Sequence, residues 1–169
     1  MANTYTLIAS STVGTAVETL TINSIPQTYT DLKLVLSLRN TLNGDYWFGG
    51  LKFNNSSSNF AVKVLQAEGT SVSSQSLSQG GVFGNGPTST SNTFSNVEVY
   101  ISNYTSSNFK SYSIDSVAEN NATGSILAIH AGLWSDTSAI TSLTIYPAYY
   151  GTSNIVANTT AYLYGIKKD

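Results

Sequence analysis

The chain has 169 residues, of which 41% are hydrophobic and only 9% are charged, and its formal net charge at pH 7 is −2. An ordinary soluble protein is charged at roughly a quarter of its positions, so Ser, Thr and Asn must supply most of the polar surface here. Because nucleic-acid binding requires clustered Lys and Arg, a chain in which Lys and Arg together number 7 and lie scattered argues against a nucleic-acid partner.

The first part of the chain alternates apolar and polar residues with a period of two, which is typical of strands with one buried face. Expected strands cover residues 4–10, 17–23, 31–39, 46–53 and 60–67. The clearest is 31–39, in which every second residue from Leu32 to Leu38 is leucine. Within 46–53, the pair Gly49–Gly50 predicts a β-bulge or a close approach to the backbone.

Residues 69–92 interrupt this pattern. They are rich in Gly and Ser and show no sustained periodicity, so we expect one long loop. Loops of this length are uncommon inside a compact domain and are usually functional or ordered by a partner. Val82 and Phe83 are its apolar exceptions and are expected to hold its middle in place.

Residues 94–134 predict the centre of the fold, a meander of three consecutive antiparallel strands. The strands are expected at 97–101, 109–117 and 125–134, joined by polar turns rich in Asn, Ser and Thr. The third strand is apolar on both faces, which predicts that it is covered on both sides in the middle of a sandwich.

The remaining expected strands cover residues 139–146 and 160–167, with a second loop at 147–158. The total is about nine or ten strands, and no convincing helix is present. We therefore predict an all-β fold, an antiparallel β-sandwich resembling a jelly roll, which forms a single domain over residues 1–169.

The sequence offers little catalytic chemistry. His130 is the only histidine and lies in the most apolar strand, so we expect a buried core residue rather than a catalyst. One histidine without a spaced second ligand cannot build a metal site, and Asp31 and Asp45 lack the spacing of a calcium loop. We expect no metal and no cofactor.

The carboxylates leave one enzymatic alternative open. Glu98 and Asp115 lie on neighbouring strands of the predicted meander and can pair. A glycosidase needs two carboxyl groups facing each other across a cleft, whereas Glu98 has the pattern of a solvated position. We therefore expect no enzyme.

The sequence has no cysteine, which excludes disulfides and thiolate metal sites. Residues 1–10 lack the basic and apolar segments of a secretory signal. No apolar run approaches the ~20 residues needed to span a bilayer. We expect synthesis in the cytoplasm and no membrane partner.

Two aromatic groups are candidate binding residues, since such rings stack on sugars or anchor protein interfaces. Tyr46, Trp47 and Phe48 follow a predicted turn, and Tyr146, Tyr149 and Tyr150 border or lie in the second loop. The alternative is that the tryptophans fill the core and the tyrosines cover its edges.

Five short segments together resemble a group of small virion proteins of tailed phages, especially marine and cyanobacterial ones. The segments are 24–32 (SIPQTYTDL), 92–96 (NTFSN), 101–108 (ISNYTSSN), 131–135 (AGLWS) and 162–168 (YLYGIKK). The resemblance extends from about residue 4 to the C-terminus and is weakest over 69–92. These segments are turn and strand patterns that carry no chemistry.

The resemblance implies a capsid cement or decoration protein that binds the outer surface of the assembled head and stabilises it. It also implies a homotrimer, the major capsid protein as partner, and location on the virion after synthesis in the host cytoplasm. The residues expected to make the contacts are Tyr5, Val82, Phe83, Tyr146, Tyr149 and Tyr150. The alternative is a receptor- or glycan-binding module of the tail or fibre, with Tyr46, Trp47 and Phe48 as its platform.

Overall fold

The computed structural model shows an antiparallel sandwich of two sheets. The structure describes residues 4–119, 124–147 and 153–167, and within these ranges the chain forms strands and no helix. In chain order the strands are β1 (Tyr5–Thr12), β2 (Leu20–Ile22), β3 (Asp31–Leu38), β4 (Tyr46–Phe53), β5 (Phe60–Glu68), β6 (Ser71–Leu77), β7 (Gly81–Asn85), β8 (Ser95–Ile101), β9 (Lys110–Ala118), β10 (Ile126–Trp134), β11 (Leu143–Tyr146) and β12 (Thr160–Ile166).

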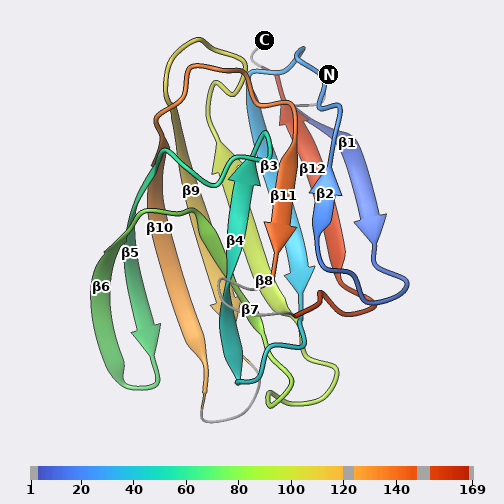
Figure 1. Ribbon diagram of the computed structural model, residues 1–169, viewed down its shortest axis with the longest axis vertical. Helices are drawn as coiled ribbons and strands as arrows, with labels where there is room; N and C mark the ends of the chain where they lie inside the picture. The colour runs from blue at the N-terminus through green and yellow to red at the C-terminus, as the bar shows by residue number, and fades with distance from the viewer. Residues whose placement is uncertain (1–3, 120–123, 148–152, 168–169) are drawn as a thin grey trace.

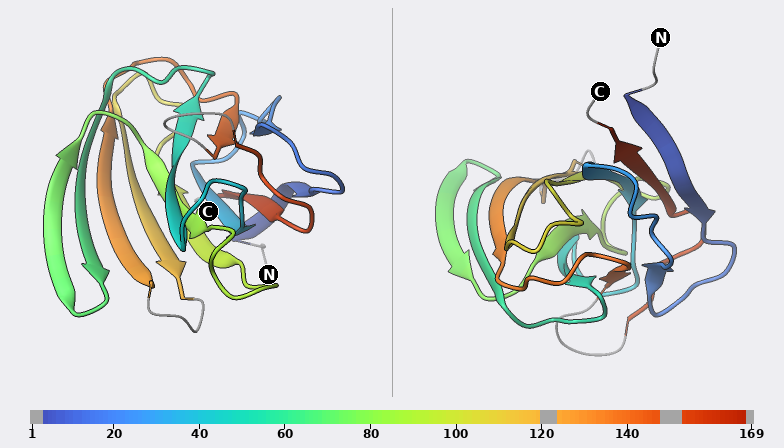
Figure 2. Two further views of the ribbon diagram at one scale, coloured as in Figure 1. Left: turned by 60° about the horizontal axis from the view of Figure 1, so that its bottom comes forward. Right: turned by 90° about the horizontal axis from the view of Figure 1, so that it is seen from above.

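The two sheets differ in size. The large sheet has eight strands in the order β1-β12-β3-β8-β9-β10-β5-β6, and the small sheet has four in the order β2-β11-β4-β7. Figure 1 shows the small sheet in front of the middle of the large one, with β5 and β6 extending beyond it on one side. Figure 2 shows the large sheet curving, with β6 at one margin and β1 at the other. The all-β antiparallel sandwich predicted from the sequence is confirmed, although a jelly roll divides its strands more evenly.

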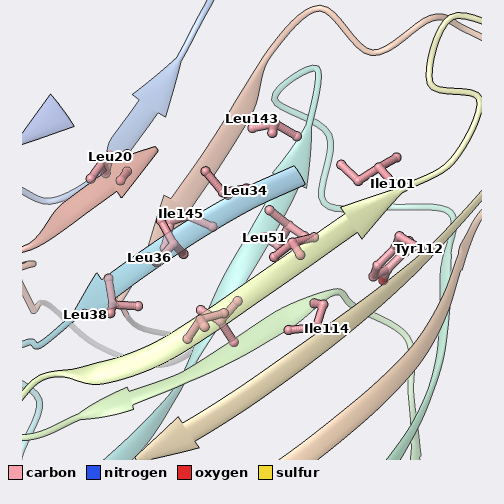
Figure 3. Packing of buried hydrophobic residues seen from close by; sticks show 14 of the residues in the cluster. Leu20, Leu34, Leu36, Leu38, Leu51, Ile101, Tyr112, Ile114, Leu143 and Ile145 are labelled. Atoms are coloured by element: carbon pink, nitrogen blue, oxygen red, sulfur yellow. The ribbon is translucent and has the colours of Figure 1, made fainter. Parts of the chain in front are cut away.

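The core between the sheets follows from the alternation in β3. Its leucines at positions 32, 34, 36 and 38 are at most 1% exposed, while the residues between them are half-buried. Figure 3 shows Leu34 and Leu36 close to side chains of the small sheet, among them Leu51 and Ile145. Burying one such side chain contributes roughly 1.5–3 kcal/mol, so the four leucines of β3 contribute strongly to the packing of the two sheets.

A second part of the core is aromatic. The ring of Phe53 meets Tyr112 and Trp134 edge-on, with ring centroids 5.4 and 5.5 Å apart, and packs on Phe60 at 5.4 Å. Edge-to-face pairs of this kind add about 0.5–1.5 kcal/mol each to the burial of their surface. Phe53 therefore links the small sheet to β5, β9 and β10 of the large one.

The predicted meander is confirmed, because β8, β9 and β10 are neighbours in that order. The prediction that its third strand is covered on both faces is wrong. Leu127 and Ile129 of β10 are 52% and 51% exposed. The small sheet packs against one face of the large sheet, and no layer of the described chain covers the other.

The prediction of one long loop over 69–92 is also wrong, because this segment contains β6 and β7. Strand β6 reads SVSSQSL and is exposed along nearly its whole length, so it needs no apolar alternation. Strand β7 reads GVFGN and is buried throughout, so it shows no alternation either. Both strands therefore lack the pattern by which half-buried strands are recognised.

The pair Gly49–Gly50 serves close packing rather than a bulge. Strand β4 pairs with β7 and β11 without a shift in register. A Cβ atom on Gly49 would lie 1.7 Å from the Trp47 ring, and one on Gly50 would lie 1.8 Å from the Tyr146 ring. Of the two predicted alternatives, the close approach to the backbone is the one that the structure shows.

Candidate functional site

The outer face of the large sheet carries a contiguous group of exposed apolar side chains. Leu65, Val72, Leu127 and Ile129 are 53%, 73%, 52% and 51% exposed. Ile129 is paired with Leu65, and Leu127 is paired with Ala67, which in turn pairs with Val72. Residues opposite each other in an antiparallel pair point to the same face, so these four form one surface, here called the outer apolar patch.

Part of the rim of the outer apolar patch is polar, while Val117 continues the apolar surface opposite Leu127. Asp115 lies opposite Ile129 on β9 and is exposed, and Lys63 on β5 donates to the hydroxyl of Ser76 on β6. Single exposed apolar residues are normal on a protein surface, whereas a contiguous apolar group with a polar rim marks a binding surface. The arrangement can hold an apolar partner and performs no chemistry of its own.

A groove of about 540 Å³ lies where β5 and β6 extend past the small sheet. Its lining, as far as the described residues form it, combines two aromatic rings, two leucines, three glutamine amides and two serine hydroxyls, without a charged group. The lining residues are Leu42, Phe48, Gln66, Gln75, Ser76, Leu77, Ser78, Gln79 and Phe83. Apolar walls with a few placed polar groups are typical of sites for small ligands.

The groove has an aromatic wall and an amide wall. Phe48 meets Phe83 edge-on with ring centroids 5.2 Å apart. On the other wall, Gln75 Nε2 donates to Gln66 Oε1 at 3.2 Å. This hydrogen bond fixes the two amides relative to each other. Together the walls suit a neutral ligand that has one apolar face and several hydroxyl or amide groups.

His130 lies on β10 behind the aromatic wall. It has no exposed surface, and the sequence-based prediction of a buried core residue is confirmed. Burial lowers the pKa of its imidazole to about 4. The backbone of Gly81 beside the ring opposes this shift, although neither ring nitrogen makes a well-directed hydrogen bond. At neutral pH the ring is therefore an uncharged core aromatic.

Lys110 is a second buried titratable residue, with no exposed surface. Its Nζ lies 5.8 Å from the centroid of the Trp134 ring and donates to the carbonyl of Asp136 at 3.3 Å. Burial lowers the pKa of this ammonium group. The carbonyl and the ring satisfy it, so its role is structural.

The three residues of the expected glycan platform do not form one surface. Side chains alternate along β4, so Trp47 points to the opposite side from Tyr46 and Phe48. Trp47 is 3% exposed and covers Gly49 and Gly84, which leaves no free ring face for a sugar. Tyr46 packs edge-on against Phe83 at 6.0 Å, and only Phe48 lines the groove.

The expected contact residues are also separated. Val82 and Phe83 are 0% and 4% exposed, so they are core residues of β7 rather than contacts at the tip of a loop. Tyr5 is 52% exposed on β1, the margin of the large sheet. Tyr146 belongs to the small sheet and lies under Lys52, whose Nζ is 4.9 Å from the ring centroid. Tyr149 and Tyr150 lie outside the described residues.

The carboxylate pair considered for an enzyme lies on an open surface. Glu98 and Asp115 are directly opposite each other in the register of β8 and β9, as the meander predicts. Glu98 forms an ion pair with Lys33 at 2.8 Å. The two carboxylates share one face of one sheet, whereas glycoside hydrolysis needs them on opposite sides of a cleft.

The residues that the structure describes contain no group of three or more His, Cys, Asp or Glu placed to hold a metal ion. None of their segments forms a helix with the length and apolar character that a membrane crossing requires. No protein-family model matches the chain, and no curated protein matches it. Among the described residues, the outer apolar patch and the groove are two surfaces suited to binding a partner or a ligand.

Proposed function

We propose that the protein is a structural component of a phage virion, a decoration protein that binds the outer surface of the assembled head and stabilises it. The observation that carries this proposal is the outer apolar patch, four large side chains presented side by side on the outer face of the large sheet. The sequence resemblance to small virion proteins of tailed phages supports the same conclusion. The activity is binding rather than turnover.

The patch suits a weak contact that is repeated many times. Each of its four side chains is still about half exposed or more. Covering the exposed part of one such side chain contributes about 1 kcal/mol. A protein that binds only the assembled lattice adds its binding free energy to the stability of that lattice by mass action.

The first test is the copy number of the protein in purified particles, measured by quantitative mass spectrometry against the major capsid protein. A decoration protein is expected at a ratio close to that of the capsid subunit. A few copies per particle would contradict the proposal and assign the protein to the tail.

The second test locates the contact. Particles that lack the protein are mixed with the purified wild type, with Ile129→Lys, and with Ser10→Lys as the matched control. Ser10 is an exposed serine on β1, at the other end of the same sheet. We expect Ile129→Lys to lose binding and Ser10→Lys to retain it, with both variants unfolding like the wild type. Equal binding by all three proteins would exclude the outer apolar patch as the contact.

A second candidate function is that of a receptor- or glycan-binding module, and the groove favours it. An aromatic wall opposite glutamine amides is a common way to hold a neutral sugar, and the lining has no charge that would select an ionic ligand. Titration with neutral oligosaccharides, followed by NMR, should then shift amide signals around Gln66 and Gln75. Gln75→Ala, at an exposed position, should weaken binding at least several-fold without unfolding the protein. Unchanged spectra at millimolar sugar would exclude this function.

A further inference from the structure

Each sheet of the sandwich has two edge strands, and an edge strand offers unpaired backbone N–H and C=O groups to a further strand. The edges of the large sheet are β1 and β6, and those of the small sheet are β2 and β7. Natural proteins block such edges with bulges, short length, charge, proline or burial. The four edges differ sharply in this respect.

Three of the edges are blocked. Strand β1 has a break in register between Leu7 and Ala9, which marks a bulge. Strand β2 has only 3 residues, and all residues of β7 are buried. None of these three strands presents a long, regular edge to a partner.

Strand β6 has none of these blocks. It runs for 7 residues, pairs with β5 without a shift in register, and contains neither proline nor a charged residue. Its residues are exposed except for the half-buried Leu77. Figures 1 and 2 show β6 at the outer margin of the sandwich with no strand beyond it.

We propose that β6 pairs with β6 of a second copy of this chain, antiparallel and about a two-fold axis, so that the large sheets of the two copies become continuous. The sequence SVSSQSL suits self-pairing, because no like charges meet when the strand is laid against its own copy. A charged peptide would gain no ion pair from this strand. The second copy is therefore the partner that its composition fits.

The symmetry restricts the register. Opposite residues of an antiparallel pair must point to the same face of the sheet. A two-fold axis normal to the sheet therefore requires that one residue of the strand lies directly opposite the same residue of the copy. Full overlap of Ser71–Leu77 with its copy then places Ser74 opposite the second Ser74, and Val72 opposite Ser76. Lys63 bonds the Ser76 hydroxyl on the same face, so its alkyl chain would lie beside Val72 of the copy.

The proposed contact is small. A strand of 7 residues is about 24 Å long, and one strand edge covers less than the ~800 Å² per partner of a standard interface. The dimer should therefore depend on concentration, with dissociation in the micromolar range or weaker. The two-fold axis is normal to the sheet, so both outer apolar patches face the same side. This inference goes beyond the proposed function and does not depend on it.

A cysteine scan tests the register on a clean background, because the natural chain has no cysteine. Opposite residues across an antiparallel pair have Cα atoms about 4.5–5.5 Å apart, within the range that a disulfide bridges. Under mild oxidation we expect Ser74→Cys to form a covalent dimer at least tenfold faster than Ser10→Cys, an exposed serine on the other edge strand. Equal rates for the two variants would overturn the proposed pairing.

A charge variant tests the association itself. Ser74→Lys places two ammonium groups opposite each other at the axis, whereas Ser10→Lys adds the same charge at the far edge. Sedimentation equilibrium of the wild type and of Ser10→Lys should show a species of twice the chain mass, and Ser74→Lys should remain monomeric with an unchanged unfolding midpoint. A wild type that stays monomeric at millimolar concentration, or a trimer that persists in Ser74→Lys, would refute the β6 pairing. Neither result would alter the copy-number test of the proposed function.

Discussion

The imidazole of His130 stacks on the ring of Phe48, with ring centroids 6.2 Å apart and planes inclined by 26°. Phe83 meets the same imidazole edge-on at 5.8 Å. Protonation would place a charge among these rings without a counter-ion, which is why the folded protein resists it. The pair joins β10 of the large sheet to β4 of the small one, and burial keeps the imidazole neutral there.

Acid should therefore destabilise the fold through His130. The ordinary pKa of an imidazole is 6.5, whereas the pKa of His130 in the folded protein is about 4. Between pH 4 and pH 6.5 the unfolded chain therefore binds more protons than the folded protein. The free energy of unfolding should be unaffected by His130 above pH 7 and should fall by about 2–3 kcal/mol between pH 7 and pH 4.5. Urea unfolding at the two pH values measures this loss of unfolding free energy. The variant His130→Leu should lack the part of the loss that comes from His130. An identical loss in the variant would show that other groups cause the acid sensitivity.

Arg39 should stabilise the turn at residues 86–93 more than a surface charge normally does. Its guanidinium donates to the carbonyls of Thr93, Thr90 and Ser89 at 2.8, 2.9 and 3.1 Å. A lysine has no planar fork of donors and cannot reproduce this set. We expect Arg39→Lys to lower the free energy of unfolding by about 2 kcal/mol and to speed amide hydrogen exchange at residues 86–93.

The ion pair between Lys33 and Glu98 provides the matched comparison. It joins two partly exposed side chains at 2.8 Å, and such pairs contribute about 0–1 kcal/mol. Lys33→Met should therefore change the unfolding free energy much less than Arg39→Lys. A larger loss in Lys33→Met would contradict this ranking.

Asn54 should stabilise the folded protein through its side-chain hydrogen bonds as well as through its backbone conformation. Its φ of 51° is left-handed, its Oδ1 accepts from the Thr141 amide at 2.7 Å, and its Nδ2 donates to the Ala139 carbonyl at 2.8 Å. Asn54→Gly removes the side-chain hydrogen bonds but adopts the left-handed backbone conformation easily. Asn54→Ala removes the same hydrogen bonds and also strains that conformation. We expect losses of about 1–2 kcal/mol for glycine and about 1 kcal/mol more for alanine, measured by urea unfolding. Equal losses would mean that backbone conformation plays no part.

Gly132 should tolerate no side chain. A Cβ atom there would lie 2.1 Å from the Tyr112 ring, which is buried and packs edge-on against Phe53 and Phe60. Gly132→Ala should therefore cost about 1–3 kcal/mol of stability. Gly14→Ala is the control, because no described atom beyond its own chain neighbours lies within 4 Å of its Cβ position. It should be neutral or slightly stabilising in the same thermal unfolding experiment.

The sequence predicts those strands that bury one face. The leucines of β3 alternate because the core lies on one side and solvent on the other, and the same holds for β8 and β9. Strand β6 meets solvent on both faces and β7 meets protein on both, so period two carries no information about either. Because these two strands escape the pattern, the sequence predicts about nine or ten strands, whereas the described chain forms twelve.

The surfaces were harder to predict than the strands. An apolar residue such as Ile129 is normally buried, so its exposure is a property of the assembled sheets that no local pattern reports. Conversely, the glycines at 49 and 84 make room for Trp47, which turns a candidate binding ring into a core residue. The groove joins Phe48 of β4 to Gln75 of β6, and their proximity depends on the curvature of the large sheet.

The strand order has a consequence for synthesis on the ribosome. Strand β12 lies between β1 and β3, and β11 lies between β2 and β4. Strands β1 and β2 therefore have no strand to pair with until β11 and β12 have been synthesised, while the meander of β8, β9 and β10 can form earlier. Long-range pairing of this kind slows folding. A nascent chain arrested before residue 143 should expose β1 and β2 to proteases and chaperones, so release of the last strands is the step that closes the sandwich.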